Sequence, residues 1–242
     1  MDFQLAIPWL IRAEGMIPHI YLDTRGYMTV GVGYMIGKPA SPHAKAYLLP
    51  WRSRSTGALE KDPDTISKEF KRFAGLPFGN KIGAASFAKI ATIELDEKTM
   101  KTLLQDDING FVAELRRKFP LYDTYPEPAQ LALMDMAYNL GSAGLFKSFP
   151  TLVTAVLAPK PDWATAAKEC HRRGPSAERN EHVRDWFLAA AGLPPGPHTV
   201  KHAPKKRSGH PPPRPKNVQV PILGGSPAIQ IPGVSPSRDR MA

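Results

Sequence analysis

Two acidic residues near the start of the sequence have the types and the spacing that glycosidic bond cleavage requires. Glu14 ends a short amphipathic segment, and Asp23 follows nine residues later in a glycine-rich stretch that also holds Thr29. Cleavage of a glycosidic bond needs one carboxyl group to protonate the leaving oxygen and a second to act on water or on the developing cation. Each residue alone has an ordinary explanation, as a solvated helix end, a turn residue or a strand residue. Together they predict an enzyme that cuts a polysaccharide.

Short elements with different periodicities are expected to position these residues. Residues 1–14 carry apolar side chains on one side and predict a helix, with Pro8 tolerated in its first turn. The stretch 21–34 alternates with a period of two and is punctuated by glycines, which predicts a small antiparallel sheet. Glu14 and Asp23 are therefore expected on different elements.

The second half of the sequence has the pattern of a series of helices. Asp96 is the predicted N-cap of a long amphipathic helix that Pro120 ends. A second helix, opened by Pro128 and ended by Gly141, is apolar nearly all round, which is typical of the centre of a helical lobe. Shorter helices are predicted at about 64–74, 149–158, 162–171 and 176–191. The expected fold class is α+β, mostly α-helical, with a small antiparallel-sheet lobe, a long connecting helix and a helical lobe.

Two segments depart from this pattern. Residues 35–92 are rich in Pro, Ser, Ala and Lys, and their role stays open: they could roof a cleft, bind peptide stems or do neither. Residues 194–242 hold twelve prolines, eight basic residues and one acid, which predicts a Pro-rich basic disordered tail. The expected organisation is a catalytic domain at 1–193, containing the insertion 35–92, followed by the tail at 194–242.

Charge composition points to an acidic partner. The formal net charge is +10, of which +7 lies in the tail. Nucleic acid, a membrane surface and an anionic wall polymer all fit such a charge. The tail lacks aromatic residues for base stacking, so no specific nucleic-acid role is expected.

Other features of the composition bear on location and cofactors. A hydrophobic content of 42% supports a packed core, and no run of eighteen apolar residues is present to cross a membrane. The first residues lack the basic region of a Sec signal peptide, and a single cysteine, Cys170, fits folding in a reducing cytosol. The seven histidines have no ligand spacing, so neither a metal site nor a cofactor is expected.

Several blocks of the sequence resemble one known family. Residues 14–33 read E-G-x7-D-x2-G-x2-T-x-G-x-G, which resembles the catalytic signature of the phage-type lysozymes, muramidases that cleave the glycan of peptidoglycan. Residues 131–141, L-A-L-M-D-M-A-Y-N-L-G, resemble that family's central helix and the turn after it. The blocks at 146–152 and 175–187 resemble its later helices. Residues 35–92, called the middle segment below, and the tail at 194–242 have no counterpart in the compact members of the family.

The resemblance implies a role for each residue of the first block. Glu14 would be the general acid that protonates the glycosidic oxygen, while Asp23 and Thr29 would hold or activate the attacking water. Arg179 would pair with the carboxyl group of Glu14, although an exposed helix arginine is the equally ordinary alternative.

Two further residues are expected to bind substrate by the same resemblance. Tyr138 and Asn139 would line the sugar-binding cleft, where the amide of Asn can both donate to and accept from an N-acetyl group. A core aromatic beside a helix C-terminal Asn is the alternative explanation. At Tyr34 the sequence departs from the family, which commonly has His there.

The function implied is a muramidase that cleaves between N-acetylmuramic acid and N-acetylglucosamine of bacterial peptidoglycan. It would act as a phage endolysin or as an injected antibacterial effector of the type VI kind. It would be made in the cytoplasm and would reach periplasmic peptidoglycan through a holin lesion or a secretion system. The second route implies a secretion-system partner or an immunity protein.

Two alternatives stay open on the same scaffold. A non-catalytic wall-glycan-binding protein would have no use for Glu14, Asp23 and Thr29 together. A lytic transglycosylase would use Glu14 as its sole acid and base and would release an anhydro product, whereas the presence of Asp23 with Thr29 favours hydrolysis.

Overall fold

The computed structural model describes residues 3–197, and within them the fold is α+β, as the sequence predicts. The helices are α1 (Phe3–Glu14), α2 (Pro63–Arg72), α3 (Glu97–Lys118), α4 (Glu127–Leu140), α5 (Ser142–Ser148), α6 (Pro150–Leu157), α7 (Trp163–Glu169) and α8 (Ala177–Ala190). The strands are β1 (Ile17–Leu22), β2 (Met28–Gly31), β3 (Tyr34–Lys38), β4 (Ser41–Pro42), β5 (Arg52–Ser53) and β6 (Ile93–Glu94). Short 3₁₀ helices are η1 (Ala44–Leu48), η2 (Ala84–Phe87) and η3 (Tyr122–Thr124).

The sheet extends on both sides of the predicted hairpin. Its order is β4-β3-β2-β1-β6-β5, with every neighbouring pair antiparallel. Tyr21 on β1 stands opposite Thr29 on β2, and His19 on β1 stands opposite Glu94 on β6. The strand that leads from Glu14 to Asp23 is therefore paired along both edges, which holds the turn after it in a fixed place.

The middle segment completes the sheet lobe. It supplies β4, β5 and α2, and its aromatic residues enter the core under the sheet together with residues of β1 and β2; these are Trp51, Phe70, Phe73 and Phe87. The N-cap of α2 is Asp62, whose carboxylate accepts from the amides of Asp64 and Thr65. Near the end of the same helix the buried Glu69 accepts from the Thr92 amide at 2.6 Å. This bond ties α2 to the start of β6.

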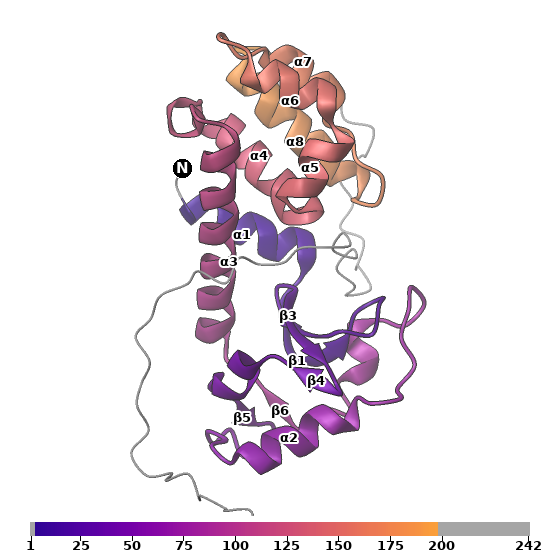
Figure 1. Cartoon of the computed structure of the whole chain (residues 1–242). Coiled ribbons are helices and arrows are strands. Elements are labelled where there is room, and N and C mark those ends of the chain that lie inside the picture. The colour runs from indigo at the N-terminus through magenta and orange to yellow at the C-terminus, as the bar shows by residue number, and fades with distance from the viewer. Residues whose placement is uncertain (1–2, 198–242) are drawn as a thin grey trace, which may run out of the picture.

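The long helix α3 joins two hydrophobic cores. Asp96 is its N-cap, as the sequence predicts, and accepts from the Thr99 amide at 2.8 Å. Met100 in the first turn belongs to the core of the sheet lobe, while Leu104 and Ile108 belong to the core of the helical lobe. Figure 1 shows α3 running along one side of the molecule between the two lobes, with α1 lying across the space between them.

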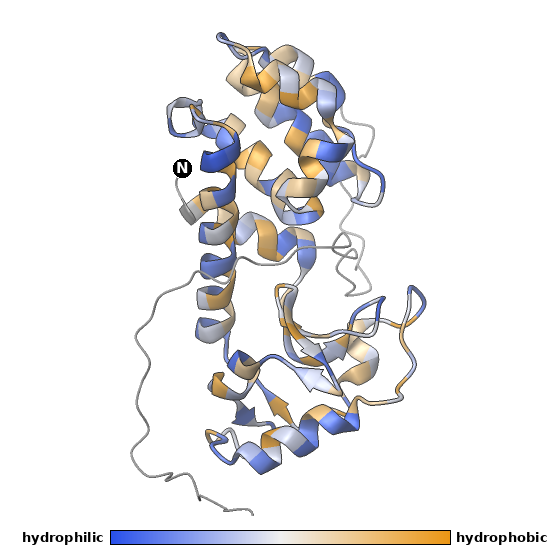
Figure 2. Cartoon of the chain, in the orientation of Figure 1, coloured by the Kyte–Doolittle hydropathy of each residue, from blue (hydrophilic) through white to orange (hydrophobic). Residues whose placement is uncertain are grey.

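The helical lobe is built around α4. This helix is buried along most of its length, consistent with its apolar sequence (Figure 2), and it packs against α3, α5 and α8. The predicted helices at about 162–171 and 176–191 are present as α7 and α8, and each begins with a side-chain cap: Asp162 accepts from the Thr165 amide and Ser176 from the Arg179 amide. The sequence pattern does not predict α5, because Gly141 is typical of a helix end. It also begins the next helix, with a φ of 73°.

The chain continues against α8 beyond the predicted domain boundary at residue 193. The Gly196 amide donates to Asp185 at 3.0 Å, and Arg184 donates to the Pro197 carbonyl at 3.1 Å. Residues 198–242, the greater part of the predicted tail, lie outside the described residues.

Candidate active site

Glu14 lies at the joint between the helical and the sheet-bearing parts of the molecule. It is the last residue of α1. Gly15 ends the helix with a φ of 81°, and its backbone amide donates a hydrogen bond to the Ile11 carbonyl at 2.9 Å. Only 8% of Glu14 is exposed. A buried carboxyl group requires a partner, and here the partner is Arg179, whose Nη1 lies 2.6 Å from Glu14 Oε1.

Arg179 reaches Glu14 from the far end of the sequence because of the way α8 begins. Its backbone amide donates to the Ser176 side chain at 3.2 Å, which fixes Arg179 in the first turn with its guanidinium directed inward. The structure thus brings together Glu14 and Arg179, which are 165 residues apart. The remaining donors of the guanidinium turn away from Glu14 toward Asp135 on α4.

Asp135 is the centre of a buried network that the sequence did not single out. It is 0% exposed, and Arg179 Nε lies 3.0 Å from its Oδ1. On the other side Arg172 Nη1 lies 2.8 Å from Asp135 Oδ2, and the Trp9 indole donates to Oδ1 at 2.9 Å. Asn180 in turn donates to the Arg172 carbonyl at 2.9 Å. The carboxyl group of Glu14 is therefore one end of a chain of alternating acids and arginines.

A signal for this network was present in the sequence. Asp135 is the one acid inside a helix that is otherwise apolar nearly all round, L-A-L-M-D-M-A-Y-N-L. A charge in such a place is almost never buried without a partner, so an inward-facing basic residue is to be expected beside it. Which basic residues lie there could not be known, because Arg172 and Arg179 reach α4 through tertiary packing.

The arginines decide the charge state of Asp135. Burial by itself raises the pKa of this carboxyl group, but the two guanidiniums of Arg179 and Arg172 outweigh burial, so the pKa lies below its ordinary value. For Arg179, burial lowers the pKa, but the charges of Asp135 and Glu14 raise it by more. The net pKa of Arg179 is therefore raised. Both groups are charged at neutral pH, and the support under Glu14 is a permanent ion-pair network.

Asp23 is held in a tight turn after β1. Its backbone amide donates to the Tyr27 carbonyl at 2.8 Å, and its Oδ1 accepts from the amides of Arg25 and Tyr27, both at 2.8 Å. Its Oδ2 makes no hydrogen bond to any described residue, and Arg25 Nε lies 4.0 Å from it. One carboxylate oxygen is thus fixed by hydrogen bonds within the turn, and the other has only the longer ion-pair contact with Arg25.

Thr29 belongs to the same hairpin. It lies buried on β2 opposite Tyr21, and its hydroxyl donates to the Tyr27 carbonyl at 3.3 Å. Tyr27 therefore links the two predicted residues, since its amide holds Asp23 and its carbonyl holds Thr29. Asp23 and Thr29 thus belong to the β1–β2 hairpin and are linked through the backbone of Tyr27.

Tyr138 and Asn139 lie near the end of α4, and both are buried. The Tyr138 hydroxyl donates to the Val32 carbonyl at 2.5 Å, which connects α4 to the turn between β2 and β3. This bond gives Tyr138 a structural role in joining the lobes. Sugar binding by Tyr138 and Asn139 stays a prediction.

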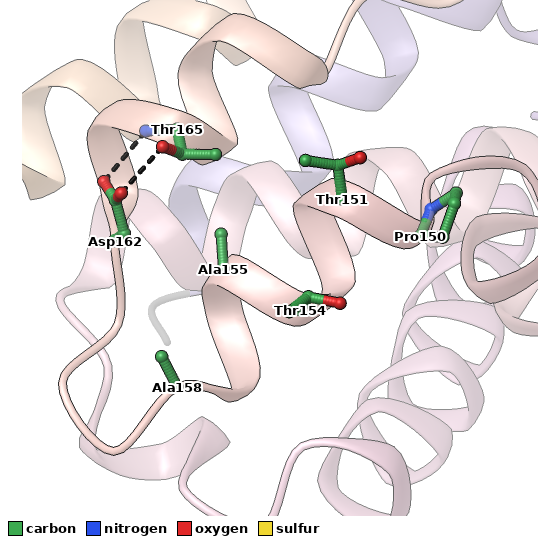
Figure 3. A pocket seen from close by; sticks show the side chains of 7 residues that line it. All are labelled: Pro150, Thr151, Thr154, Ala155, Ala158, Asp162 and Thr165. Carbon is green, nitrogen blue, oxygen red and sulfur yellow. Dashed lines mark hydrogen bonds between the residues drawn. The ribbon is translucent and has the colours of Figure 1, made fainter.

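No other chemical centre competes with this site in the described part of the chain. Residues 3–197 contain no group of three side chains suited to hold a metal ion, and none of their helices is long and apolar enough to cross a membrane. A shallow depression of about 550 Å³ lies between α6 and α7 and is lined by threonine, alanine and proline (Figure 3). Its single carboxylate, Asp162, is occupied by the amide and hydroxyl of Thr165. That depression holds no free acid or base.

Comparison with known proteins gives a distant similarity. No family model matches the sequence. Over 162 residues, 66% of this chain, the sequence is 27% identical to the pre-baseplate central spike protein Gp5 of Enterobacteria phage T4. The aligned part is 23% of that spike protein, so this chain spans less than a quarter of its relative's length. The chain is thus similar to one segment of a phage baseplate component.

Proposed function

We propose that the chain is a muramidase that hydrolyses the glycan of peptidoglycan between N-acetylmuramic acid and N-acetylglucosamine, on a lysozyme-like fold. The observation that carries the proposal is the state of the two carboxyl groups. In Glu14 and in Asp23, one oxygen is held by the protein and the other makes no hydrogen bond to a described residue. This is the arrangement that a positioned acid and a positioned base require.

Glu14 would act on the leaving group. Arg179 holds Oε1, so the proton would be carried on Oε2 and delivered to the glycosidic oxygen as the bond to the anomeric carbon breaks. Burial at the end of α1 keeps bulk water from competing for this proton. The rigid contact from Arg179 to Asp135 would keep the carboxyl group in one orientation during the reaction.

Asp23 and Thr29 would act on water at the opposite face of the sugar. Oδ1 of Asp23 is fixed by two amides, so Oδ2 would accept a proton from water as the water oxygen bonds to the anomeric carbon. Thr29, linked through Tyr27, would help to hold that water. The products would be a sugar with inverted configuration at the anomeric carbon and a free hydroxyl on the leaving sugar.

The setting in which this activity would be used is also proposed. The similarity to a protein named as a phage central spike supports a phage or phage-like setting. Between an endolysin and an injected effector, the neighbouring genes decide: a holin gene favours the first and an immunity gene the second. In either case the substrate would be periplasmic peptidoglycan.

The test is digestion of purified peptidoglycan by wild type, Glu14→Gln and Asp23→Asn, followed by product mass and anomeric NMR. We expect wild type to release reducing muramic acid ends with inverted configuration. Each substitution is expected to lower kcat by about 100-fold or more, because each removes one proton-transfer group. Anhydro products would instead identify a lytic transglycosylase. Binding without cleavage by wild type would identify a wall-binding protein.

A further inference from the structure

The loop between α2 and η2, residues 74–83, is exposed but anchored at both ends. Phe73 before it and Ala84 after it are fully buried in the core of the sheet lobe. The Ala84 carbonyl accepts from His19 Nε2 on β1 at 3.1 Å, which fixes the end of the loop to the sheet. In Figure 1 this loop lies beside the hairpin that carries Asp23.

Phe78 in this loop packs directly on the Asp23 turn. A Cβ atom built on Gly26 would lie 2.8 Å from Cε1 of the Phe78 ring, closer than real Cβ contacts come. Gly26 also has a φ of 78°, so both the turn and the ring contact require glycine here. Yet 52% of Phe78 remains exposed, so the ring meets the turn with part of its surface and leaves the rest open.

The other aromatic ring at this turn is already covered. The guanidinium of Arg25 lies 4.9 Å from the centroid of the Tyr27 ring, and Lys38 Nζ lies 5.3 Å from it. Both cations occupy the ring by cation–π contact. Phe78 is therefore the aromatic surface that the turn offers to a ligand. It is a large, half-exposed apolar group that packs on Gly26, three residues after Asp23 in the same turn.

We propose that Phe78 forms a stacking subsite for a pyranose ring of the glycan next to the scissile bond. The inference rests on the proposed function, because a glycan cleaved between Glu14 and Asp23 must pass the Asp23 turn. One face of a pyranose ring presents C–H bonds, which match the negative face of an aromatic ring. The middle segment then has a role in substrate binding, with Phe78 as a binding residue.

The test separates stacking from loop packing by choice of variant. Phe78→Leu keeps an apolar contact with Gly26 but removes the aromatic face, while Phe78→Trp keeps both. Leu48→Ala is the matched control, because Leu48 is an 81% exposed apolar residue of the same middle segment. KM and kcat on soluble glycan fragments are measured, together with calorimetric binding of the same fragments to each variant carrying Glu14→Gln and thermal unfolding of all proteins.

For Phe78→Leu we expect KM to rise about tenfold and kcat to change less than about twofold, because a contact made equally in the ground and transition states is lost. Phe78→Trp and Leu48→Ala should keep the wild-type KM, and the unfolding temperatures should agree. A wild-type KM in Phe78→Leu would overturn the subsite.

Failure of the proposed function gives a different result. Suppose that wild type does not cleave, that the Glu14→Gln protein binds fragments, and that adding Phe78→Leu abolishes this binding. The subsite then stands and the proposed hydrolysis is wrong. If neither protein binds or cleaves, both inferences are wrong.

Discussion

At the scale of single residues, the arrangement around Glu14 depends on Asp135, which is fully buried. Asp135 forms ion pairs with two buried arginines, Arg172 and Arg179, and Arg179 also holds Glu14. Removing one partner from a buried pair leaves an uncompensated charge in a medium of low polarity, whereas the same change at the surface is screened by water. The described part of the chain contains both situations.

Asp135→Asn is expected to lower the free energy of unfolding by about 3–5 kcal/mol, because the buried Arg172 loses its charged partner and Arg179 keeps only Glu14. Asp123→Asn is the control, since Asp123 makes a similar two-oxygen contact with Arg116 at the surface. That change should cost less than about 1 kcal/mol. Urea unfolding of the three proteins at neutral pH measures both effects. Equal losses in the two variants would contradict the importance assigned to the buried network.

The lowered pKa of Asp135 also sets the pH range in which protonation of this residue destabilises the protein. Its ordinary pKa is 3.8, and in the folded protein the pKa is lower because the arginines outweigh burial. The stabilisation is therefore complete above pH 3.8 and is lost only as pH falls through the folded value. Asp135 therefore does not contribute to pH dependence near neutrality.

At the scale of elements, β1 is the part of the sheet on which both acids depend. It starts three residues after Glu14, ends one residue before Asp23 and pairs with β2 and β6. The same strand carries His19, whose ring contacts the Ala84 carbonyl of η2 and so holds the end of the loop with Phe78. Burial lowers the pKa of His19, and this effect exceeds that of the hydrogen bond to Ala84, which raises it.

We expect the stability of the protein to fall as pH drops below 6.5, the ordinary pKa of histidine. The unfolded chain binds the proton first, because the folded pKa of His19 is lower, and the loss continues down to that folded value. Urea unfolding at pH 8 and at pH 5 measures the loss. His19→Gln keeps an amide donor for Ala84 and should reduce the difference between the two pH values. His43→Gln, at an exposed histidine, should leave the difference as in wild type; the same reduction in both would refute the assignment to His19.

At the scale of the whole molecule, two hydrophobic cores and an uneven charge distribution are the main features. The cores are joined by α3, and the Tyr138 hydroxyl bound to Val32 adds a second connection. Of the net charge of +10, residues 198–242 carry +7. We expect charge of this sign and density to attract an anionic polymer.

Deletion of residues 198–242 is expected to weaken binding to peptidoglycan sacculi and to reduce the dependence of binding on salt, since seven net positive charges are removed. Turnover of short soluble fragments should stay within about twofold of wild type, because these fragments contact the site alone. The cut after Pro197 preserves the contacts of Arg184 and Asp185. Sedimentation with sacculi at low and high salt measures binding. Loss of turnover on soluble fragments would show that the domain boundary is wrong.

Local signals in the sequence predicted the approximate bounds of most of the α-helices and the hairpin that follows Glu14. Asp96, Asp162 and Ser176 are helix caps because a short polar side chain can satisfy backbone amides three residues ahead. Alternation and glycines predicted the hairpin that holds Asp23 and Thr29. These features depend on neighbours a few residues away, so the order of residue types is sufficient to find them.

Contacts between distant segments were decided by the tertiary structure. The partners of Asp135, the pairing of β6 with β1 and the placement of Phe78 on Gly26 join residues that lie far apart in the chain. A buried acid predicts that a base must reach it, but many arginines satisfy that requirement equally until the helices pack. Because α8 packs against α4, Arg179 Nε contacts Asp135. The Nη1 atom of the same guanidinium then donates to Glu14.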